Sequence, residues 1–240
     1  MATPLEYELV VFDLAGTTVH DGDAVNRALR VALQQAGLRV PRAAINQVMG
    51  LPKPAALRQL IQEYDGSGAL LPHLEQIHSE FVVAMRRYYQ TDHQVREVGG
   101  ASAVFRALHD AGVMVALNTG FSREITETLL ERLGWDDEAL IDATITSDEV
   151  ERGRPFPDMI QRLMAQLNVS NPRHVVKVGD TPSDIQEGRN AGCGLVIGVT
   201  QGSHSYEELA PCGADVLLGT VAELPAFLGL APLPAFIQSS

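Results

Sequence analysis

The stretch LVVFDLAGTT, residues 9–18, decides the fold of this chain. Its four leading apolar residues predict a buried β-strand that ends at Asp13, and the Gly and Thr residues that follow predict a tight turn. A second stretch, VVKVGDTPSD, residues 175–184, places Asp180 at the end of another apolar run. Carboxylates at the carboxyl ends of parallel strands can hold Mg²⁺ beside a nucleophile. The two stretches therefore predict an α/β protein with its site at one edge of a parallel sheet.

The rest of the chain alternates apolar runs with amphipathic stretches. Further strands are predicted at Val113–Leu117, Leu195–Val199 and Val216–Leu218, and helices at Ala101–Ala111, Arg123–Leu133, Pro157–Leu167 and Ser183–Ala191. We expect Ser122 and Ser183 to be helix N-caps, and Gly112, Gly134 and Gly192 to stand at helix C-termini. This alternation predicts a Rossmann-like parallel sheet with helices on both faces.

Between residues 21 and 91 no strand pattern is found. Helical patterns cover Ala24–Ala36, Arg42–Val48, Lys53–Tyr64 and Leu74–Tyr89. We therefore expect an all-helical cap domain, residues 21–91, inserted into a core domain formed by residues 1–20 and 92–240. Lys53, expected on a cap loop, would face Asp13 across the crevice between the two domains. The Pro-, Ala- and Ser-rich tail, residues 231–240, is expected to fray.

Composition narrows the function classes. The chain has 240 residues, with 18 Lys and Arg against 30 Asp and Glu, and a formal net charge of −12. Such an acidic protein lacks the basic surface that nucleic acid or an anionic membrane requires, so neither is an expected partner. The two cysteines form no CxxC pair, and no apolar run reaches the length of a membrane span. We expect a soluble cytoplasmic protein.

Asp13 and Asp180 are the candidate centre of the chemistry. Asp13 can be a nucleophile that takes a phosphoryl group as an aspartyl-phosphate, or a simple helix-capping residue. Its carboxylate, that of Asp180 and the backbone carbonyl of Ala15 would suffice as protein ligands for Mg²⁺, which keeps several waters. Asp184, four residues after Asp180, is expected to act through water or by orienting its neighbours.

The chain also has residues that can bind a phosphoryl group: cationic side chains and the end of a further predicted strand. Thr119 and Gly120 end a predicted strand before a helix, where a hydroxyl and backbone N–H groups can hold phosphoryl oxygens. Arg154 offers a permanent charge and forked donors for charge balance, with Arg152 as its rival. Lys53 can bind substrate phosphate as a cation, or form a Schiff base with a carbonyl if its pKa is lowered. The residues leave these two roles equally open.

From Val10 to about Gly202 the chain resembles the phosphonatase (phosphonoacetaldehyde hydrolase-like) branch of the haloacid dehalogenase superfamily. The resemblance rests on D-x-A-G-T-T from residue 13, M-G-L before Lys53, T-G-x-S-R-E from residue 119, G-R-P from residue 153, and K-V-G-D-T through E-G-R-N-A-G, residues 177–192. Ordinary phosphatases of the superfamily carry a second Asp and a Lys where this chain has Ala15 and Arg154. Their joint replacement favours this branch.

The resemblance implies a Mg²⁺-dependent hydrolase that cleaves the C–P bond of a small 2-oxoalkyl phosphonate. Asp13 would be the nucleophile, Lys53 the Schiff-base residue, and Thr119 and Arg154 further catalytic residues. The implied substrate-binding residues are Ala15, Gly16, Thr17, Met49, Gly50, Gly120, Phe121 and Arg123. The implied metal ligands are Asp13, Ala15, Asp180 and Asp184. Relatives in this branch pair through their caps, so the resemblance also implies, by analogy, a homodimer formed through the cap.

Three departures from the phosphonatase pattern leave the identity of the substrate open. Phosphonatases carry His, Cys and Tyr where this chain has Ala56, Asp23 and Phe121, and the segment from Gly202 to Leu209 is more similar to phosphoglycolate phosphatases. The alternative is therefore a phosphomonoesterase in which Lys53 only binds the substrate. A third hypothesis is a catalytically silent protein that binds an anionic ligand in the crevice.

Overall fold

The structure, a computed structural model, describes residues 6–136 and 139–233. Its centre is a six-stranded parallel sheet with the strand order β3-β2-β1-β4-β5-β6. The strands are β1 (Leu9–Asp13), β2 (Met114–Thr119), β3 (Ala143–Thr146), β4 (Val175–Gly179), β5 (Leu195–Val199) and β6 (Val216–Leu218). The first strand lies between β2 and β4, so the ends of these three strands meet at one edge.

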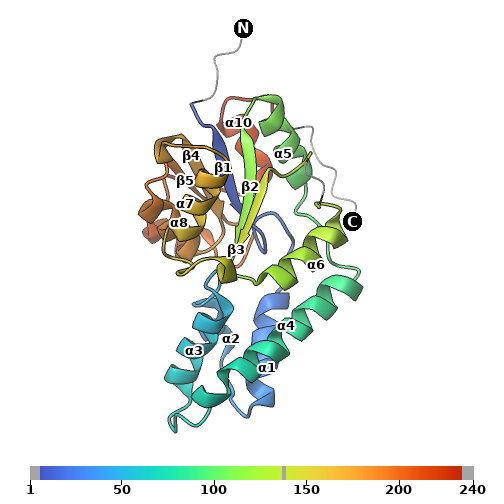
Figure 1. Ribbon diagram of the computed structural model, residues 1–240, viewed down its shortest axis with the longest axis vertical. Coiled ribbons are helices and arrows are strands. Elements are labelled where there is room, and N and C mark those ends of the chain that lie inside the picture. Colours follow the sequence, from blue (N-terminus) through green and yellow to red (C-terminus); the bar gives the residue numbers. More distant parts are fainter. Residues whose placement is uncertain (1–5, 137–138, 234–240) are drawn as a thin grey trace.

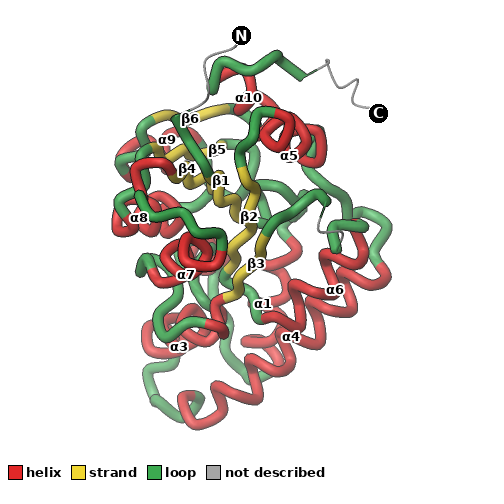
Figure 2. Tube along the Cα trace, turned by 45° about the horizontal axis from the view of Figure 1, so that its top comes forward, coloured by secondary structure: helices red, strands yellow, loops and turns green. Residues whose placement is uncertain are grey.

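Helices cover both faces of the sheet, as predicted. Side chains of β1 alternate between two hydrophobic clusters because successive residues of a strand point to opposite faces. Val10 and Phe12 pack with α5 (Ala101–Asp110) and α10 (Leu224–Phe227), whereas Leu9 and Val11 pack with α7 (Asp158–Gln166) and α8 (Pro182–Ala191). Figure 2 shows the strands between these two helical layers. The core helices are α5 (Ala101–Asp110), α6 (Arg123–Leu133), α7 (Asp158–Gln166), α8 (Pro182–Ala191), α9 (Tyr206–Leu209) and α10 (Leu224–Phe227).

Four helices form a separate group beyond the carboxyl end of the sheet (Figure 1). They are α1 (Ala24–Gln35), α2 (Arg42–Asn46), α3 (Lys53–Tyr64) and α4 (Leu74–Thr91), and we call them the cap. Short 3₁₀ turns are found at Leu71–His73, Ser147–Glu149, Pro172–His174, Ala210–Cys212 and Val221–Glu223. The domain boundaries at residues 20/21 and 91/92 stay a prediction. Of the predicted frayed tail, residues 234–240 lie outside the described residues.

The sequence analysis missed one strand and misplaced one cap. β3 has only four residues and alternates Ala and Ile with Thr, so it lacks the continuous apolar run that marked the other strands. The N-cap of α8 is Thr181 and not Ser183, because Thr181 accepts the N–H of Asp184 in a capping box. Ser122 is the N-cap of α6, but its side chain makes no capping hydrogen bond. Gly112, Gly134 and Gly192 all have positive φ at helix ends, as expected.

None of the helices in the described ranges is both long and apolar enough to cross a membrane.

Candidate active site

A small cavity of about 20 Å³ lies between the carboxyl end of the sheet and the cap. Most of the predicted site residues line it together. The lining residues are Asp13, Ala15, Val25, Met49, Gly50, Lys53, Thr119, Gly120, Phe121 and Thr181. The cavity therefore joins the ends of β1 and β2 to the loop that precedes α3, as the predicted crevice requires.

Lys53 reaches this cavity from the first turn of α3, so the expectation that it lies on a cap loop was wrong. Its side chain is buried, and its Nζ donates to the carbonyl of Leu51 at 3.1 Å. The same Nζ lies 5.3 Å from the centre of the Phe121 ring. Burial lowers the pKa of Lys53 to about 8, although the nearby charge of Asp13 opposes this shift. The neutral form of this amine is therefore easier to reach near physiological pH than that of an exposed lysine.

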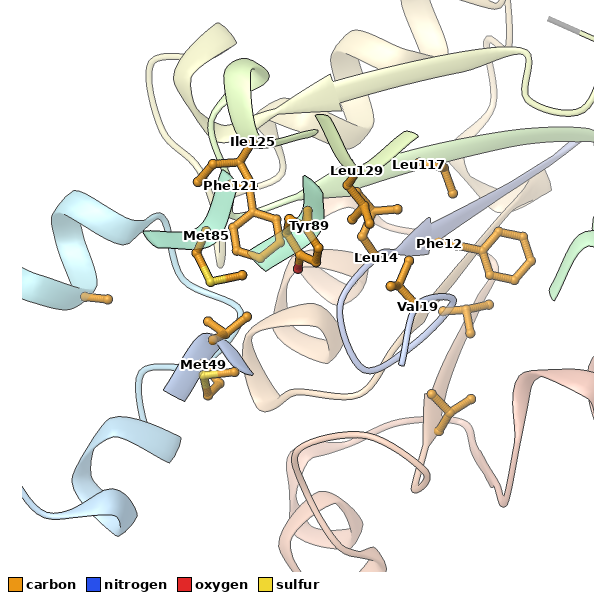
Figure 3. Close-up of a cluster of buried hydrophobic side chains, with 14 of the residues drawn as sticks. Phe12, Leu14, Val19, Met49, Met85, Tyr89, Leu117, Phe121, Ile125 and Leu129 are labelled. Atoms are coloured by element: carbon orange, nitrogen blue, oxygen red, sulfur yellow. The ribbon is translucent and has the colours of Figure 1, made fainter. Parts of the chain in front are cut away.

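Aromatic and sulfur-containing side chains seal the contact between the cap and the core around this lysine. Figure 3 shows Phe121, which follows β2, beside Met85 and Tyr89 of α4. The rings of Tyr89 and Phe121 meet edge to face with their centres 6.0 Å apart. This packing helps to bury the side chain of Lys53 and so accounts for the desolvation of its amine.

Three glycines let the loop before α3 lie directly against the core. A Cβ atom on Gly120 would stand 2.6 Å from the carbonyl oxygen of Leu51, and one on Gly153 would stand 2.4 Å from Pro52. Gly50 has a φ of +80°, and its Cβ would stand 2.3 Å from Thr181 Oγ1. These distances leave no room for a methyl group, so the close approach depends on glycine.

Asp13, Asp180 and Asp184 form a buried carboxylate cluster at the ends of β1 and β4. One oxygen from each lies within 4.8 Å of the others. Asp180 is held by Thr17 Oγ1 at 3.1 Å and by the N–H and hydroxyl of Ser203. Burial, together with the charges of Asp13 and Asp184, raises the pKa of Asp180 to about 7. Such a cluster of oxygen donors fits a hard divalent cation.

Gly16 and Thr17 lie against the side chain of Asp180. The sequence predicts that both contact the substrate in the cavity. A Cβ on Gly16 would stand 2.3 Å from Asp180 Oδ2, and its φ of +97° also favours glycine. Neither residue is among those that line the cavity. Their part is to let Asp180 approach β1 and to hold it there.

Arg154 is a cation that contacts two of these carboxylates. Its Nη1 lies 2.6 Å from Asp13 Oδ1 and 3.0 Å from Asp184 Oδ1, and the side chain is fully buried. Burial raises the pKa of Asp13, and the neighbouring guanidinium only partly offsets this effect. Its rival, Arg152, instead pairs with Asp158 at 3.0 Å and is 55% exposed. Arg154 therefore has the predicted position for charge balance.

Arg123 is not among the residues that line the cavity, and its contact with substrate stays a prediction. Its guanidinium bonds to the hydroxyl and carbonyl of Thr144 and pairs with Glu149. These partners belong to β3 and the turn that follows it, and β3 was the strand that the sequence analysis missed. Without that strand in view, Arg123 had no evident partner.

Among the buried polar residues of the site, Asn118, Lys177 and Glu187 had no role predicted from the sequence. Lys177 is fully buried within β4, and its Nζ lies 2.9 Å from Asp184 Oδ1 and 3.4 Å from Glu187 Oε2. A signal was available, because a lysine inside an apolar strand run needs a buried partner. Glu187, one helical turn after Asp184, stands where that partner would be.

The whole cluster has an excess of negative charge. Four carboxylates, those of Asp13, Asp180, Asp184 and Glu187, surround two cations, Arg154 and Lys177. With every group ionised, two negative charges are left, which is the charge that one divalent cation neutralises.

Comparison with known proteins gives the family. Residues 10–198 match the family model of haloacid dehalogenase-like hydrolases. The chain belongs to this family. It is therefore a hydrolase, and the resemblance stated from the motifs is confirmed; the silent binding protein is set aside.

Phosphonoacetaldehyde hydrolases and a predicted phosphoglycolate phosphatase are among the proteins that are similar to this hydrolase. The phosphonoacetaldehyde hydrolase of Bacillus mycoides (strain KBAB4) is 30% identical over 224 residues, which cover 85% of this chain and 81% of the relative. A phosphonoacetaldehyde hydrolase-like protein from Oleispira antarctica superposes with a TM-score of 0.82 at 24% identity, over 95% of this chain and 92% of that one. A predicted phosphoglycolate phosphatase from Haemophilus somnus 129PT gives 0.76 at 18% identity, over 92% and 98%. The two structural similarities support the fold.

Proposed function

We propose that this hydrolase cleaves the C–P bond of a small 2-oxoalkyl phosphonate with the help of Mg²⁺. The observation that carries the proposal is that Lys53, buried and with a lowered pKa, lines the same cavity as Asp13. Ala15 supports it, because a general acid at that position would protonate an oxygen leaving group, and a departing carbon has no use for one. The similarity to phosphonoacetaldehyde hydrolases favours the same reaction.

Asp13, Asp180 and the backbone carbonyl of Ala15 would hold Mg²⁺, with Asp184 beside them. The donor set fits, since the carboxylates of Asp13, Asp180 and Asp184 are buried close together and the whole cluster leaves two negative charges uncompensated. When bound, the ion neutralises the phosphoryl oxygens and the nucleophile, which would otherwise repel each other.

The residues of this chain then divide the work. The neutral Nζ of Lys53 adds to the substrate carbonyl, and loss of water leaves a protonated imine. A carboxylate oxygen of Asp13 attacks phosphorus, the P–C bond breaks, and its electron pair enters the imine to give an enamine. Proton uptake at carbon and hydrolysis release the aldehyde or ketone from Lys53. Water hydrolyses the aspartyl-phosphate, so the net reaction consumes one water and yields phosphate.

Trapping tests the Schiff base. Borohydride added during turnover of phosphonoacetaldehyde should leave a reduced two-carbon adduct on Lys53, which peptide mass spectrometry would locate. Lys177 is an internal control, since it is buried in an ionic cluster and should remain unmodified. Full turnover with an unmodified Lys53 would eliminate the imine mechanism.

A second candidate function is hydrolysis of a small phosphate ester such as phosphoglycolate, with Lys53 as a phosphate-binding cation. It is favoured by Ala56, Asp23 and Phe121, which replace the polar residues of phosphonatases. The Lys53→Arg variant distinguishes the two functions, because arginine keeps the charge but forms no imine. Phosphate release from phosphonoacetaldehyde, phosphonopyruvate and phosphoglycolate should be compared for both proteins. Retained activity of the variant would favour the esterase.

A further inference from the structure

We propose that Glu187 and Asn118 position Arg154, and through it the carboxylate of Asp13. This inference rests on the proposed role of Asp13 as the nucleophile. Glu187 and Asn118 are fully buried and do not line the cavity, so they do not contact the substrate. Their effect on the reaction therefore has to pass through another side chain.

Four hydrogen bonds and one further ion pair hold the guanidinium of Arg154. Nε donates to Glu187 Oε2 at 3.0 Å, and Nη2 donates to the carbonyl of Asn118 at 2.7 Å and to its Oδ1 at 2.6 Å. Nη1 faces Asp13 and Asp184, as described above. The guanidinium is held on three sides and cannot rotate without breaking a buried hydrogen bond.

Glu187 is itself fixed. Asn118 Nδ2 lies 2.9 Å from both of its carboxylate oxygens, and Lys177 Nζ, 3.4 Å away, also donates to Asn118 Oδ1 at 2.7 Å. Asn118 thus accepts from both cations and donates to the carboxylate between them. Buried networks with this many hydrogen bonds hold their members in one geometry.

This network explains why the cation is an arginine here. The ammonium of a lysine carries three donors on one nitrogen, so it cannot face Asp13 and also reach Glu187 and both acceptors of Asn118. Glu187 would then be a buried carboxylate with fewer donors. We infer that arginine at position 154 requires Glu187 and Asn118, and that together they set the orientation of Asp13 toward phosphorus.

A double-mutant cycle tests the proposal. Glu187→Gln and Arg154→Lys are made singly and together, and kcat and KM are measured with phosphonoacetaldehyde and with p-nitrophenyl phosphate. We expect Glu187→Gln to lower kcat by about 10–100-fold with little change in KM, and to add less than about 3-fold when Arg154 is already replaced. Equal losses in both backgrounds, or a change in KM alone, would overturn the proposal.

The matched control is Glu124→Gln, which removes an exposed ion pair with Arg86 and should leave kcat unchanged. If Glu187→Gln does not fold, Glu187→Asp takes its place, since it keeps the charge but withdraws it from Arg154. Fluorine NMR of the beryllofluoride adduct on Asp13, formed with Mg²⁺, needs no turnover. Adduct affinity should fall at least about 10-fold in the variant, and an unchanged affinity would also overturn the proposal. Failure of the wild type on both substrates would count against the proposed function alone.

Discussion

Among single residues, Lys53 matters most for the proposed function, because its charge state decides which reaction it can support. Burial lowers its pKa to about 8, so the neutral fraction increases as the pH rises through 8. For a phosphonate substrate we expect kcat/KM to increase over this range and to level off above it. A pH–rate profile checks this expectation, and p-nitrophenyl phosphate, which needs no imine, should lack the increase. A rate that falls through pH 8 would contradict the neutral amine.

Asp13 gives the second prediction at this scale. Asp13→Asn replaces the proposed nucleophile with an amide of the same shape, and we expect phosphate release to fall by about 10⁴-fold or more. Asp110→Asn, an exposed position at the end of α5, is the control and should retain activity. Activity within tenfold of wild type after Asp13→Asn would exclude an aspartyl-phosphate on this residue.

Asp13 and Asp180 were predictable from the sequence because each stands at the end of a strand. Asp13 and Asp180 follow apolar runs at once, so their position at the sheet edge is visible in the local pattern. Lys177 and Glu187 take their meaning from partners 59 and 69 residues away at Asn118, which no local pattern contains. Buried ionic networks of this kind depend on contacts between residues that are far apart in the chain. The local pattern of a single sequence does not reveal such contacts.

At the scale of elements, the loop that precedes α3 is fitted against the core through glycine. A methyl group on Gly120 would stand 2.6 Å from the Leu51 carbonyl, so Gly120→Ala must move the loop and Lys53 with it. A displacement of about 1 Å at a catalytic group costs on the order of 10²-fold in rate, and we expect such a loss in kcat. Steady-state kinetics measure it. Gly99→Ala, with open space around it among the described atoms, is the control; equal behaviour of the two variants would refute the close fit.

Helices and strands differed in how well the sequence predicted them. The predicted bounds of α3 and α6 are those observed, because long amphipathic stretches with Gly or Pro at their ends leave little choice. β3 was missed because four residues that alternate with Thr are too few to establish a period. The loss mattered for the site, since the partner of Arg123 lies on that strand.

At the scale of the whole molecule, the buried negative charge couples stability to metal. Cation binding to the folded form should relieve the repulsion among Asp13, Asp180 and Asp184. A ligand at one hundred times its Kd stabilises a protein by about 2.7 kcal/mol, so we expect Mg²⁺ to raise Tm by about 5–10 °C relative to EDTA. Calorimetry checks this, and Asp180→Asn should abolish the shift. An equal shift in the variant would place the metal elsewhere.

Pairing of two molecules through the cap stays a prediction. Val31 of α1 and Val83 of α4 are 46% and 64% exposed and line one groove of the cap. If that face pairs, Val83→Glu should convert a dimer into a monomer in sedimentation experiments, because it would bury a charge. Tyr206→Glu, at an exposed position on α9, should leave the dimer intact. A wild-type monomer at all concentrations would end the hypothesis.

The two chain segments that connect the cap to the sheet lie side by side. Val19 bridges Glu97 in antiparallel fashion, and the His20 N–H donates to the Arg96 carbonyl at 3.1 Å. Both connections therefore leave the sheet at the same place. Everything between them, Lys53 included, could be exchanged for another insert, in evolution or at the bench, while the sheet and its carboxylate cluster kept their shape and met a new substrate.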